Sequence, residues 1–149
     1  MNFDSRWLIE MPRKEAQELD PFGLDDFFSR LPEMNSKGDV ESIIQEVLTL
    51  DLPRFPSRNA SLSEHLAAMR DLGIIVASLK RHEVDAIKII PGLSGALAAI
   101  AKKTGMVPRD TVLHYCWWNP SGSRQRTFTG AEQERNLIEA TSAALPGVE

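Results

Sequence analysis

The sequence predicts an all-α domain, and three observations support this fold class. Apolar residues recur at helical spacing in the longer segments, and turns rich in Pro, Gly and Asn separate those segments. No window shows the sustained two-residue alternation of a half-buried strand. A strand competes only over Val112–Trp118, which is β-branched and aromatic. We therefore expect a single helical domain over residues 1–149, with a core over residues 20–145 and a flexible or partner-dependent segment over residues 1–19.

Composition and charge exclude several function classes. The 149 residues are 42% hydrophobic and 26% charged, as in ordinary soluble globular proteins. A net charge of −4 and a pI near 5.4 argue against a general nucleic-acid-binding protein, which usually carries a basic face. The single cysteine excludes an internal disulfide and favours the reducing cytoplasm. We expect no signal peptide, because Asp4 and Glu10 flank the short apolar run Trp7–Ile9 near the N-terminus. We expect no membrane span, because the most apolar window, Leu72–Leu79, is too short.

Residues 1–60 are expected to form helices separated by breaks that contain proline. A Pro suits the first position of the first helix, and Asp39 can cap the third. The residue before a Pro disfavours helix, so Leu31-Pro32 is expected to close the second. The expected segments are helices over Pro12–Leu19, Leu24–Arg30 and Val40–Leu50, a break at Asp20-Pro21, a turn over Asn35–Gly38 and a loop over Asp51–Ala60.

The longest helix is expected over Leu62–Arg81. It opens with a capping-box pattern, Ser61–Glu64. Apolar residues form a broad face, and Ile74 and Ile75 extend the apolar surface further round, which indicates a central helix covered on several sides. Gly73 costs about 1 kcal/mol relative to Ala inside a helix, and we interpret it as a point of close approach by a neighbouring element.

The second half of the chain predicts shorter helices. The expected segments are a helix or turn over Val84–Ile90 with Val84, Ile87 and Ile90 inward, and a helix over Leu93–Lys103 with Leu93, Leu97 and Ile100 buried, stopped by Thr104-Gly105. A helix from Pro108 through His114 is expected to end at Asn119-Pro120. A second capping box, Thr129–Glu132, opens the last helix, Ala131–Leu145, in which Leu137, Ile138 and Leu145 are expected to be buried.

A candidate binding site lies in Thr111–Gly130, where an apolar, aromatic run passes into a polar, basic turn. This is the composition of the wall and rim of a pocket. At least one of Trp117 and Trp118 is expected in the core, and the other can stack on an aromatic ligand. Arg124 and Arg126 can bind a carboxylate or phosphate through bidentate bonds. The alternative is an exposed loop that caps the last helix.

The histidines and the cysteine have competing interpretations. His82 is either a solvated helix end or a pocket residue that donates a hydrogen bond or moves a proton, whereas His65 is expected at the surface. His114 is either a core histidine with one satisfied hydrogen bond or a pocket residue. Cys116 has no neighbouring base and is expected to be a buried, small apolar residue. His114 and Cys116 do not have metal-ligand spacing, so no metal site is expected.

An ordered set of short motifs extends over nearly the whole chain from about Asp20. The motifs are Asp20-Pro21, Leu31–Asn35, Lys37–Val40, Ala67–Gly73, Ser78–His82, Ile90–Leu93, Pro108-Arg109, Leu113-His114, Trp118–Pro120 and Thr129-Gly130. Their order and spacing resemble the monodechloroaminopyrrolnitrin synthase family, the ring-rearranging enzymes of pyrrolnitrin biosynthesis. That family belongs to the all-helical, haem-dependent indoleamine/tryptophan 2,3-dioxygenase superfamily.

The resemblance implies a role in secondary metabolism but covers only part of a family member. Family members are much longer, and this chain resembles their N-terminal portion. The later helices, which bring the haem-ligating histidine and a Gly-rich substrate loop, have no counterpart here. His82 and His114 match family positions, but neither matches the axial ligand. We therefore expect haem b only together with the missing C-terminal portion and none in the isolated chain.

The resulting hypothesis is an N-terminal domain or split subunit of a haem-dependent dioxygenase-like enzyme that acts on tryptophan or a related aromatic amino acid. Its substrate-binding residues would be His114, Trp118, Arg124, Arg126 and His82, and no catalytic residue is assigned. The alternative is a non-catalytic helical module, a truncated family remnant, for small-molecule binding or oligomerisation. The long helix would lose part of its cover, so a homodimer or a partner chain that supplies the missing helices is expected. Neither nucleic acid nor membrane is an expected partner.

Overall fold

A computed structural model describes residues 13–52 and 59–145, and helices are the only regular elements in this part of the chain. They are α2 (Arg13–Glu18), α3 (Asp25–Lys37), α4 (Val40–Leu48), α5 (Leu62–Arg81), α6 (Ala86–Ile89), α7 (Leu93–Thr104), the π-helix η2 (Leu113–Trp117), the 3₁₀ turn η3 (Gly122–Arg124) and α8 (Glu132–Ala144). The all-α prediction is confirmed, and the segment where a strand competed is helical. No helix among the described residues is long and apolar enough to cross a membrane.

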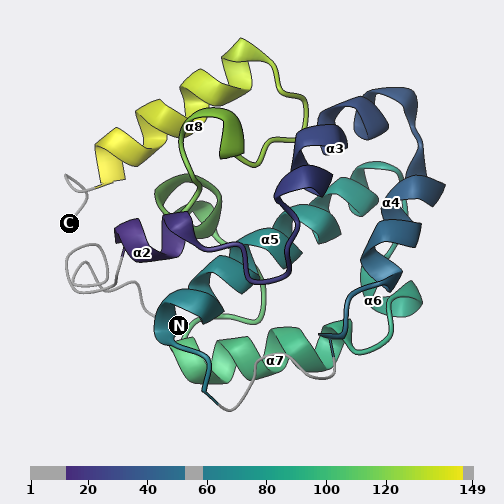
Figure 1. Cartoon of the computed structure of the whole chain (residues 1–149), viewed down its shortest axis with the longest axis horizontal. Helices are drawn as coiled ribbons and strands as arrows, with labels where there is room; N and C mark the ends of the chain where they lie inside the picture. Colours follow the sequence, from purple (N-terminus) through teal and green to yellow (C-terminus); the bar gives the residue numbers. More distant parts are fainter. Residues whose placement is uncertain (1–12, 53–58, 146–149) are drawn as a thin grey trace.

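Helix α5 crosses the middle of the molecule and contacts α2, α6, α7 and η2 (Figure 1). Its predicted bounds are confirmed. The predicted capping box is present, because Ser61 Oγ accepts a bond from the Glu64 N–H at 3.1 Å while the Glu64 carboxylate accepts one from the Ser61 N–H at 3.3 Å. Ile74 and Ile75 are completely buried within the chain. The expectation that α5 leaves apolar surface uncovered is therefore wrong, and a homodimer or partner chain stays a prediction without that support.

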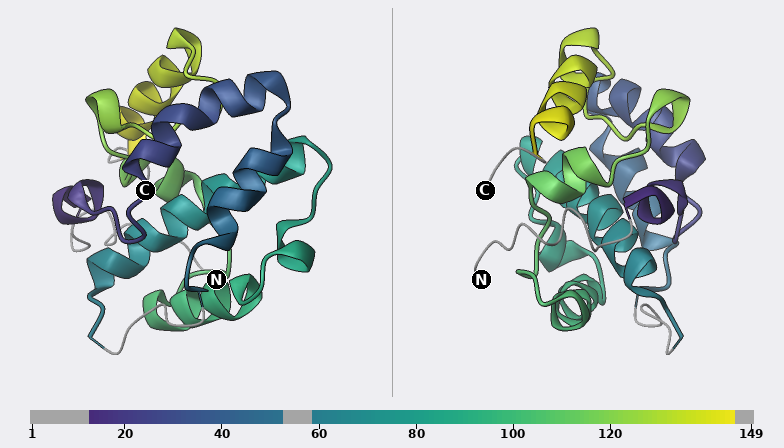
Figure 2. Two further views of the ribbon diagram at one scale, coloured as in Figure 1. Left: turned by 45° about the vertical axis from the view of Figure 1, so that its right-hand side comes forward. Right: turned by 90° about the vertical axis from the view of Figure 1, so that its left-hand side faces the viewer.

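Two apolar clusters form the core. The large cluster lies between α3, α4, α5, α6 and α7 and contains Phe27, Leu31, Ile43, Leu72, Ile75 and Leu97 among others. The small cluster joins α2, the first turns of α5, η2 and α8 through Ala16, Leu66, Met106, Leu113, Cys116, Trp117, Trp118, Ile138 and Leu145. Figure 2 shows α8 and the segment before it on one side of α5, and α7 below. The small cluster also extends the core to Ala16, before the predicted start at residue 20.

Gly73 permits a close contact between α5 and the loop that precedes η2. A Cβ at this position would lie 2.2 Å from Cβ of Asp110, a separation that real side chains do not adopt. The predicted close approach at Gly73 is confirmed, and Asp110 in an irregular loop is the approaching residue. Burial raises the pKa of the Asp110 carboxyl group above its ordinary value.

Helix α3 does not end at Leu31-Pro32 as predicted. It continues to Lys37, with Pro32 inside it, and ends at Gly38, which adopts the left-handed conformation with φ 65°. Pro32 removes one N–H from the helix but leaves the following turn intact. Leu31 and Met34 are both buried in the large cluster, so packing on either side of Pro32 outweighs the local preference. The four-residue turn expected at 35–38 is accordingly the last helical turn and its cap.

The predicted start of the next helix at Pro108 is wrong, whereas its predicted end before Asn119-Pro120 is confirmed. Residues 106–111 are irregular, Val112 is the N-cap, and the π-helix η2 runs over Leu113–Trp117. Thr111 marks this start, because its hydroxyl oxygen accepts a bond from the Leu113 N–H at 3.2 Å. A short side-chain acceptor that takes a backbone N–H sets the beginning of a helix more strongly than a Pro that can occupy its first position.

The start of α8 differs from the predicted capping box. Glu134, rather than Glu132, accepts the backbone N–H bonds of Phe128 and Thr129, each at 2.7 Å. Ile138 and Leu145 are buried as predicted, but Leu137 is 63% exposed. In α6, Ile90 is buried at the cap while Ile87 is 51% exposed, so its predicted inward orientation is wrong. In α6 the helix has only four residues, so Val84 and Ile90 lie outside it and the helical spacing does not apply across all three positions.

Candidate functional site

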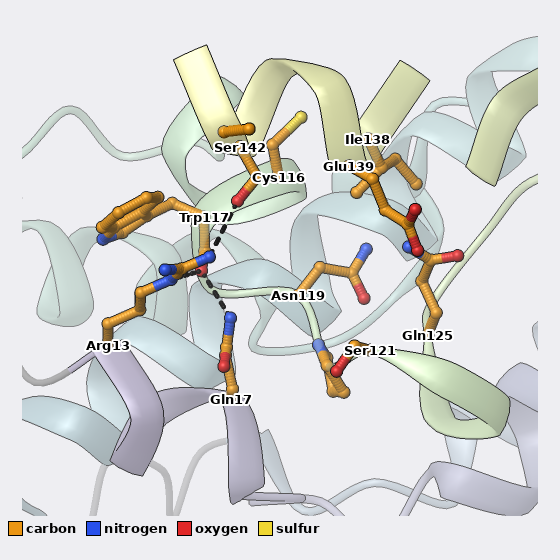
Figure 3. Close-up of a pocket in the computed structure, with 12 residues that line it drawn as sticks. Arg13, Gln17, Cys116, Trp117, Asn119, Ser121, Gln125, Ile138, Glu139 and Ser142 are labelled. Carbon is orange, nitrogen blue, oxygen red and sulfur yellow. Dashed lines mark hydrogen bonds between the residues drawn. The ribbon is translucent and has the colours of Figure 1, made fainter. Parts of the chain in front are cut away.

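A pocket of about 620 Å³ opens between α2, η2, the loop after η2 and α8 (Figure 3). It is lined by Arg13 and Gln17 of α2, Cys116 and Trp117 of η2, Asn119, Pro120, Ser121 and Gln125 of the loop, and Ile138, Glu139, Ser142 and Ala143 of α8. This size, with mixed apolar and polar walls, is typical of a small-molecule site. We refer to it as the α2–α8 pocket.

The α2 wall is fixed by bonds to the backbone of η2. Arg13 Nε donates to the Trp117 carbonyl at 3.4 Å and Gln17 Nε2 donates to the same oxygen at 3.0 Å. Arg13 Nη2 also donates to Ser142 Oγ at 3.1 Å, which ties α2 to α8. The Arg13 guanidinium stacks over the Trp117 indole, 3.7 Å from the ring centroid. Arg13 and Gln17 lie four residues apart, so both side chains leave α2 on the same face.

The floor of the pocket is the π-helix η2. The Trp118 N–H donates to the Leu113 carbonyl five residues earlier at 3.0 Å, which is the spacing of a π turn. Single π turns are frequent at functional sites, because the extra residue changes where side chains point. Here the turn places Cys116 and Trp117 at the pocket and leaves Trp118 completely buried.

The loop after η2 is held in place by Asn119. Its Nδ2 donates to the carbonyls of Tyr115 at 2.9 Å and Arg126 at 2.8 Å, and its Oδ1 accepts from the Arg126 N–H at 2.8 Å. The buried Asn119 side chain therefore satisfies one carbonyl of η2 and both backbone polar groups of Arg126. This pins Pro120, Ser121 and Gln125 along the pocket wall.

Behind the pocket lies a buried ion network that the sequence did not suggest. Arg70, Asp71 and Arg126 have completely buried side chains. Asp71 Oδ1 accepts from Arg70 Nε at 2.7 Å and from Arg126 Nε at 3.1 Å. Arg126 also pairs with Asp20 and Asp25, and the more exposed Arg124 pairs with Asp25. Three arginines thus balance three aspartates, so no buried charge is left uncompensated.

The same network joins four separate segments. Arg70 Nη1 donates to the carbonyls of Ala16 at 2.8 Å and Trp118 at 3.0 Å, and Nη2 donates to that of Leu19 at 2.8 Å. Burial opposes ionisation of Asp25, but hydrogen bonds from Arg124 and Arg126 outweigh it and lower its pKa. Burial likewise opposes the charge on Arg126, but Asp71 and Asp25 raise its pKa. The network therefore fixes α2, α3, α5 and the pocket loop relative to one another.

The sequence matches the family described as Monodechloroaminopyrrolnitrin synthase PrnB over residues 42–146, more than two thirds of the chain. The chain belongs to the monodechloroaminopyrrolnitrin synthase family. The family resemblance inferred from the ordered motifs is confirmed for this portion. Through the family the chain is related to haem-dependent oxygenase-like enzymes. The match includes α5, η2 and α8 and begins after α2, so it covers the floor and the α8 wall of the pocket.

The structure of this family member places the predicted basic residues inside the fold. Arg126 is completely buried, with its guanidinium shared between Asp20, Asp25 and Asp71 and stacked 4.7 Å from the ring centroid of Phe28. The Arg124 side chain is 35% exposed and bonds to Asp25 and to two carbonyls of α2. Both guanidinium groups form ion pairs and hydrogen bonds within the described chain. Neither is therefore available to bind a ligand in the α2–α8 pocket through two parallel hydrogen bonds.

His114 and Trp118 lie together in the small cluster. Their rings meet edge to face with centroids 5.0 Å apart, and both side chains are buried. His114 Nδ1 accepts a bond from the Thr111 N–H at 2.9 Å. Burial, with a smaller contribution from the charge of Arg70, lowers the pKa of His114 to about 3. His114 is therefore neutral at physiological pH and acts as a core histidine. Because Trp118 is buried, the prediction that at least one of Trp117 and Trp118 lies in the core is confirmed.

The other reactive side chains are also engaged or inert. His82 is the C-cap of α5, and its Nε2 hydrogen-bonds to Asn35 Oδ1 at 3.1 Å. It is therefore neither a fully solvated helix end nor a residue of the α2–α8 pocket. His65 is 3% exposed and its Nδ1 bonds to the Ser61 carbonyl at 2.7 Å, so its predicted surface position is wrong. Cys116 is buried as predicted, and burial raises the pKa of its thiol. Tyr115 makes a short hydrogen bond to Glu134.

The histidines of the described chain lie away from the α2–α8 pocket. None of the three histidines lines the α2–α8 pocket, and each ring has a nitrogen bonded to a neighbouring group. The described part of the chain contains no group of three or more His, Cys, Asp or Glu side chains that would hold a metal ion. An axial ligand for haem iron needs an imidazole or thiolate that reaches open space. No step of a reaction can be derived through haem from these residues.

Sequence reasoning missed most of the residues that line the pocket. Arg13, Gln17 and Glu139 sit in segments without aromatic or glycine-rich motifs, so local composition does not single them out. The one available signal was the i, i+4 pair Arg13 and Gln17 on a predicted helix, whose common face is otherwise small and polar. The contact between α2 and α8 spans almost the full length of the chain, and only the tertiary fold reveals it.

Proposed function

We propose that this chain is the N-terminal domain or a split subunit of a haem-dependent dioxygenase-like enzyme that acts on tryptophan or a related aromatic amino acid. The observation that carries the proposal is the family match over residues 42–146. The α2–α8 pocket is the place where the chain would hold such a substrate. Trp117, Pro120 and Ile138 supply apolar wall, and the surrounding amides and charges supply orientation.

In this proposal, the site residues that were predicted from the sequence do not contact the ligand. They hold the walls of the pocket in place. Trp118 and His114 pack behind η2, and Arg126 holds the loop that carries Ser121 and Gln125. Arg124 ties the same loop to Asp25, and His82 fixes α5 against Asn35 at a greater distance along the chain. Their removal is expected to loosen the pocket and to lower stability together.

Oxygen chemistry would need a second polypeptide or a further portion that brings haem and its axial histidine. Haem would supply dioxygen activation when bound there, while this chain binds and orients the aromatic substrate. The association of the two portions, or of two copies of this chain, is part of the proposal. A neighbouring reading frame that encodes helices with the axial histidine would identify a separate partner chain.

The test combines two titrations of the purified chain. In calorimetry, L-tryptophan is expected to bind one to one, and replacement of Trp117 by Leu should weaken binding because the indole forms part of the wall. In absorption spectroscopy, haem alone is expected to give no one-to-one complex with a sharp Soret band. Such a band should form only when the partner polypeptide is added. Absence of tryptophan binding would refute the substrate assignment.

A second candidate is a helical binding module without oxygen chemistry. It is favoured by the described lining of the α2–α8 pocket, in which burial raises the pKa of the Cys116 thiol and so makes it a poor nucleophile. This candidate also predicts tryptophan binding. The haem titration distinguishes the two candidates. For a binding module, adding a partner polypeptide should give neither a Soret band nor consumption of oxygen in the presence of tryptophan.

A further inference from the structure

We propose that α2 is a lid that opens and closes over η2 and one wall of the α2–α8 pocket, while the rest of the fold stays in place. Helix α2 lies at the edge of the molecule (Figure 1) and supplies the pocket residues Arg13 and Gln17 (Figure 3). When α2 moves away, this wall of the pocket is removed and a ligand can enter or leave from that side. The inference does not depend on which ligand the pocket holds.

The apolar contact that holds α2 is small. The helix has six residues, and Ala16 is its only buried side chain. In α5, by contrast, most side chains are buried. Isolated helices shorter than about 12–15 residues are marginal in water, so α2 stays helical only while it is docked. Local opening requires the least free energy where few apolar contacts are lost, so α2 should open without the rest of the domain.

Hydrogen bonds supply the rest of the docking. Gln17 Nε2 and Arg13 Nε donate to the Trp117 carbonyl at 3.0 and 3.4 Å, and Arg13 Nη2 donates to Ser142 Oγ at 3.1 Å. Each of these groups can bond to water instead when α2 leaves, so the net contribution of each bond is modest. The indole Nε1 of Trp117 is buried and has no acceptor within the described chain. Water that reaches the ring after opening would supply that partner.

The buried ion network stays paired when α2 leaves. Arg70 and Arg124 donate to this segment only at backbone carbonyls of residues 16–19. After opening, Arg70 keeps Asp71 at 2.7 Å and Arg124 keeps Asp25 at 3.1 Å. The opening therefore leaves no charge without its partner, which would be the costly outcome.

The hinge of the lid lies at Leu19, directly before an anchored residue. The Asp20 carboxylate accepts the N–H bonds of Leu24 at 2.7 Å and Asp25 at 3.0 Å, and it pairs with Arg126 at 3.2 Å. These bonds hold the start of α3 and do not involve α2, so Asp20 stays in place. The motion of α2 therefore ends at Leu19.

The chain contains a reporter on each side of the pocket. Trp117 faces α2, with the Arg13 guanidinium 3.7 Å from its ring centroid, so opening of the lid should admit acrylamide to the indole. Cys116 is the only cysteine, and its sulfur points toward α8 and away from α2 (Figure 3). Its alkylation by iodoacetamide should therefore report opening of the α8 side. Quenching is measured with Trp7 replaced by Phe, because Trp118 is completely buried.

Two substitutions in α2 test the lid in the full chain. Gln17→Ala removes one docking bond and should raise the acrylamide quenching constant of Trp117 about fivefold, while the alkylation rate of Cys116 stays unchanged. Lys14→Ala is the matched control, because Lys14 is exposed on the same helix, and it should alter neither rate.

Hydrogen exchange measures the opening of the unsubstituted chain. The amides of residues 17–19 should exchange at least about tenfold faster than the Trp118 amide, which donates to the Leu113 carbonyl at 3.0 Å. Equal rates would overturn the lid, because α2 would then open only together with the core. An unchanged quenching constant in Gln17→Ala, or a parallel rise in Cys116 alkylation, would overturn it as well. The test uses no tryptophan, so its failure would leave the proposed function standing.

Discussion

The two sides of α5 are held by different kinds of contact, although the residues responsible are adjacent in sequence. On one side Leu72, Ile74 and Ile75 enter the large cluster, where the contacts are apolar. On the other side Arg70 and Asp71 begin a buried ion network that reaches Arg126 and supports the α2–α8 pocket. Apolar packing depends mainly on volume, whereas a buried ion network depends on every partner being present. The side with the more demanding contacts is the side that carries the candidate site.

The largest effect on stability is expected when one charged residue of the buried ion network is removed. Arg126→Met keeps much of the side-chain volume but leaves Asp20 without its cation and Asp71 with Arg70 alone. We expect a loss of about 3–5 kcal/mol in the free energy of unfolding, measured by urea denaturation. Arg124→Gln is the matched control, since the Arg124 side chain is 35% exposed, and it should cost about 0–1 kcal/mol. Equal losses in the two variants would contradict the difference between the two arginines.

The stability of the folded chain should also depend on pH, because His114 is buried near Arg70. Its pKa is lowered to about 3 in the folded chain, against 6.5 ordinarily, so the unfolded chain binds a proton first as pH falls. Stability is therefore present above pH 6.5 and is lost toward pH 3, by up to about 1.4 kcal/mol for each pH unit. Denaturation at pH 7, 6, 5 and 4 measures this slope. His114→Gln should flatten the curve between pH 6.5 and 4, and an unchanged slope in that variant would assign the effect to another group.

A pair of glycine substitutions compares α5 with a helix that has free space beside it. Gly73→Ala should destabilise by about 1–3 kcal/mol, because the added Cβ would overlap Asp110 and this outweighs the gain in helix propensity. Gly95→Ala in α7 meets nothing within 4 Å and should stabilise by up to about 1 kcal/mol. Thermal unfolding of the two variants measures both effects. Stabilisation by Gly73→Ala would show that the Asp110 loop moves away without cost.

The smallest effect is expected at the exposed surface of α8. Leu137 is 63% exposed, so Leu137→Ser should change the free energy of unfolding by no more than about 0.5 kcal/mol. Its neighbour Ile138 is 2% exposed, and Ile138→Ala should cost about 2–5 kcal/mol. A large loss at Leu137 in urea denaturation would indicate that this residue is covered in solution by another chain.

The fold was largely predictable where local rules act without competition. The Ser61–Glu64 capping box, the bounds of α5 and the left-handed Gly105 that ends α7 follow from side-chain chemistry over a few residues. Prediction failed where distant contacts override local preference. Pro32 lies inside α3 because Leu31 and Met34 pack on both sides of it, and Glu134 replaces Glu132 because it also bonds Tyr115.

The candidate site was less predictable than the fold for a physical reason. Aromatic and basic residues in 111–130 indicated a pocket, and η2 does form its floor. The sequence cannot show, however, which arginines are neutralised inside the fold. Arg126 is satisfied by three aspartates that lie 55 or more positions away, while Arg13, more than 100 positions from Trp117, lines the pocket. Only the tertiary arrangement distinguishes a structural arginine from one that faces a ligand.

The measurement that tests the account most directly is a titration of the isotope-labelled chain with L-tryptophan, followed by two-dimensional NMR. The sequence has three tryptophans, so the indole N–H signals can be assigned by single replacements with Phe. We predict that the Trp117 indole signal and the backbone amides of residues 117–121 shift, together with Arg13 and Gln17, while the Trp118 indole signal stays in place. Shifts centred on Asn35 and His82, with none at residues 117–121, would contradict the assignment of the α2–α8 pocket as the ligand site.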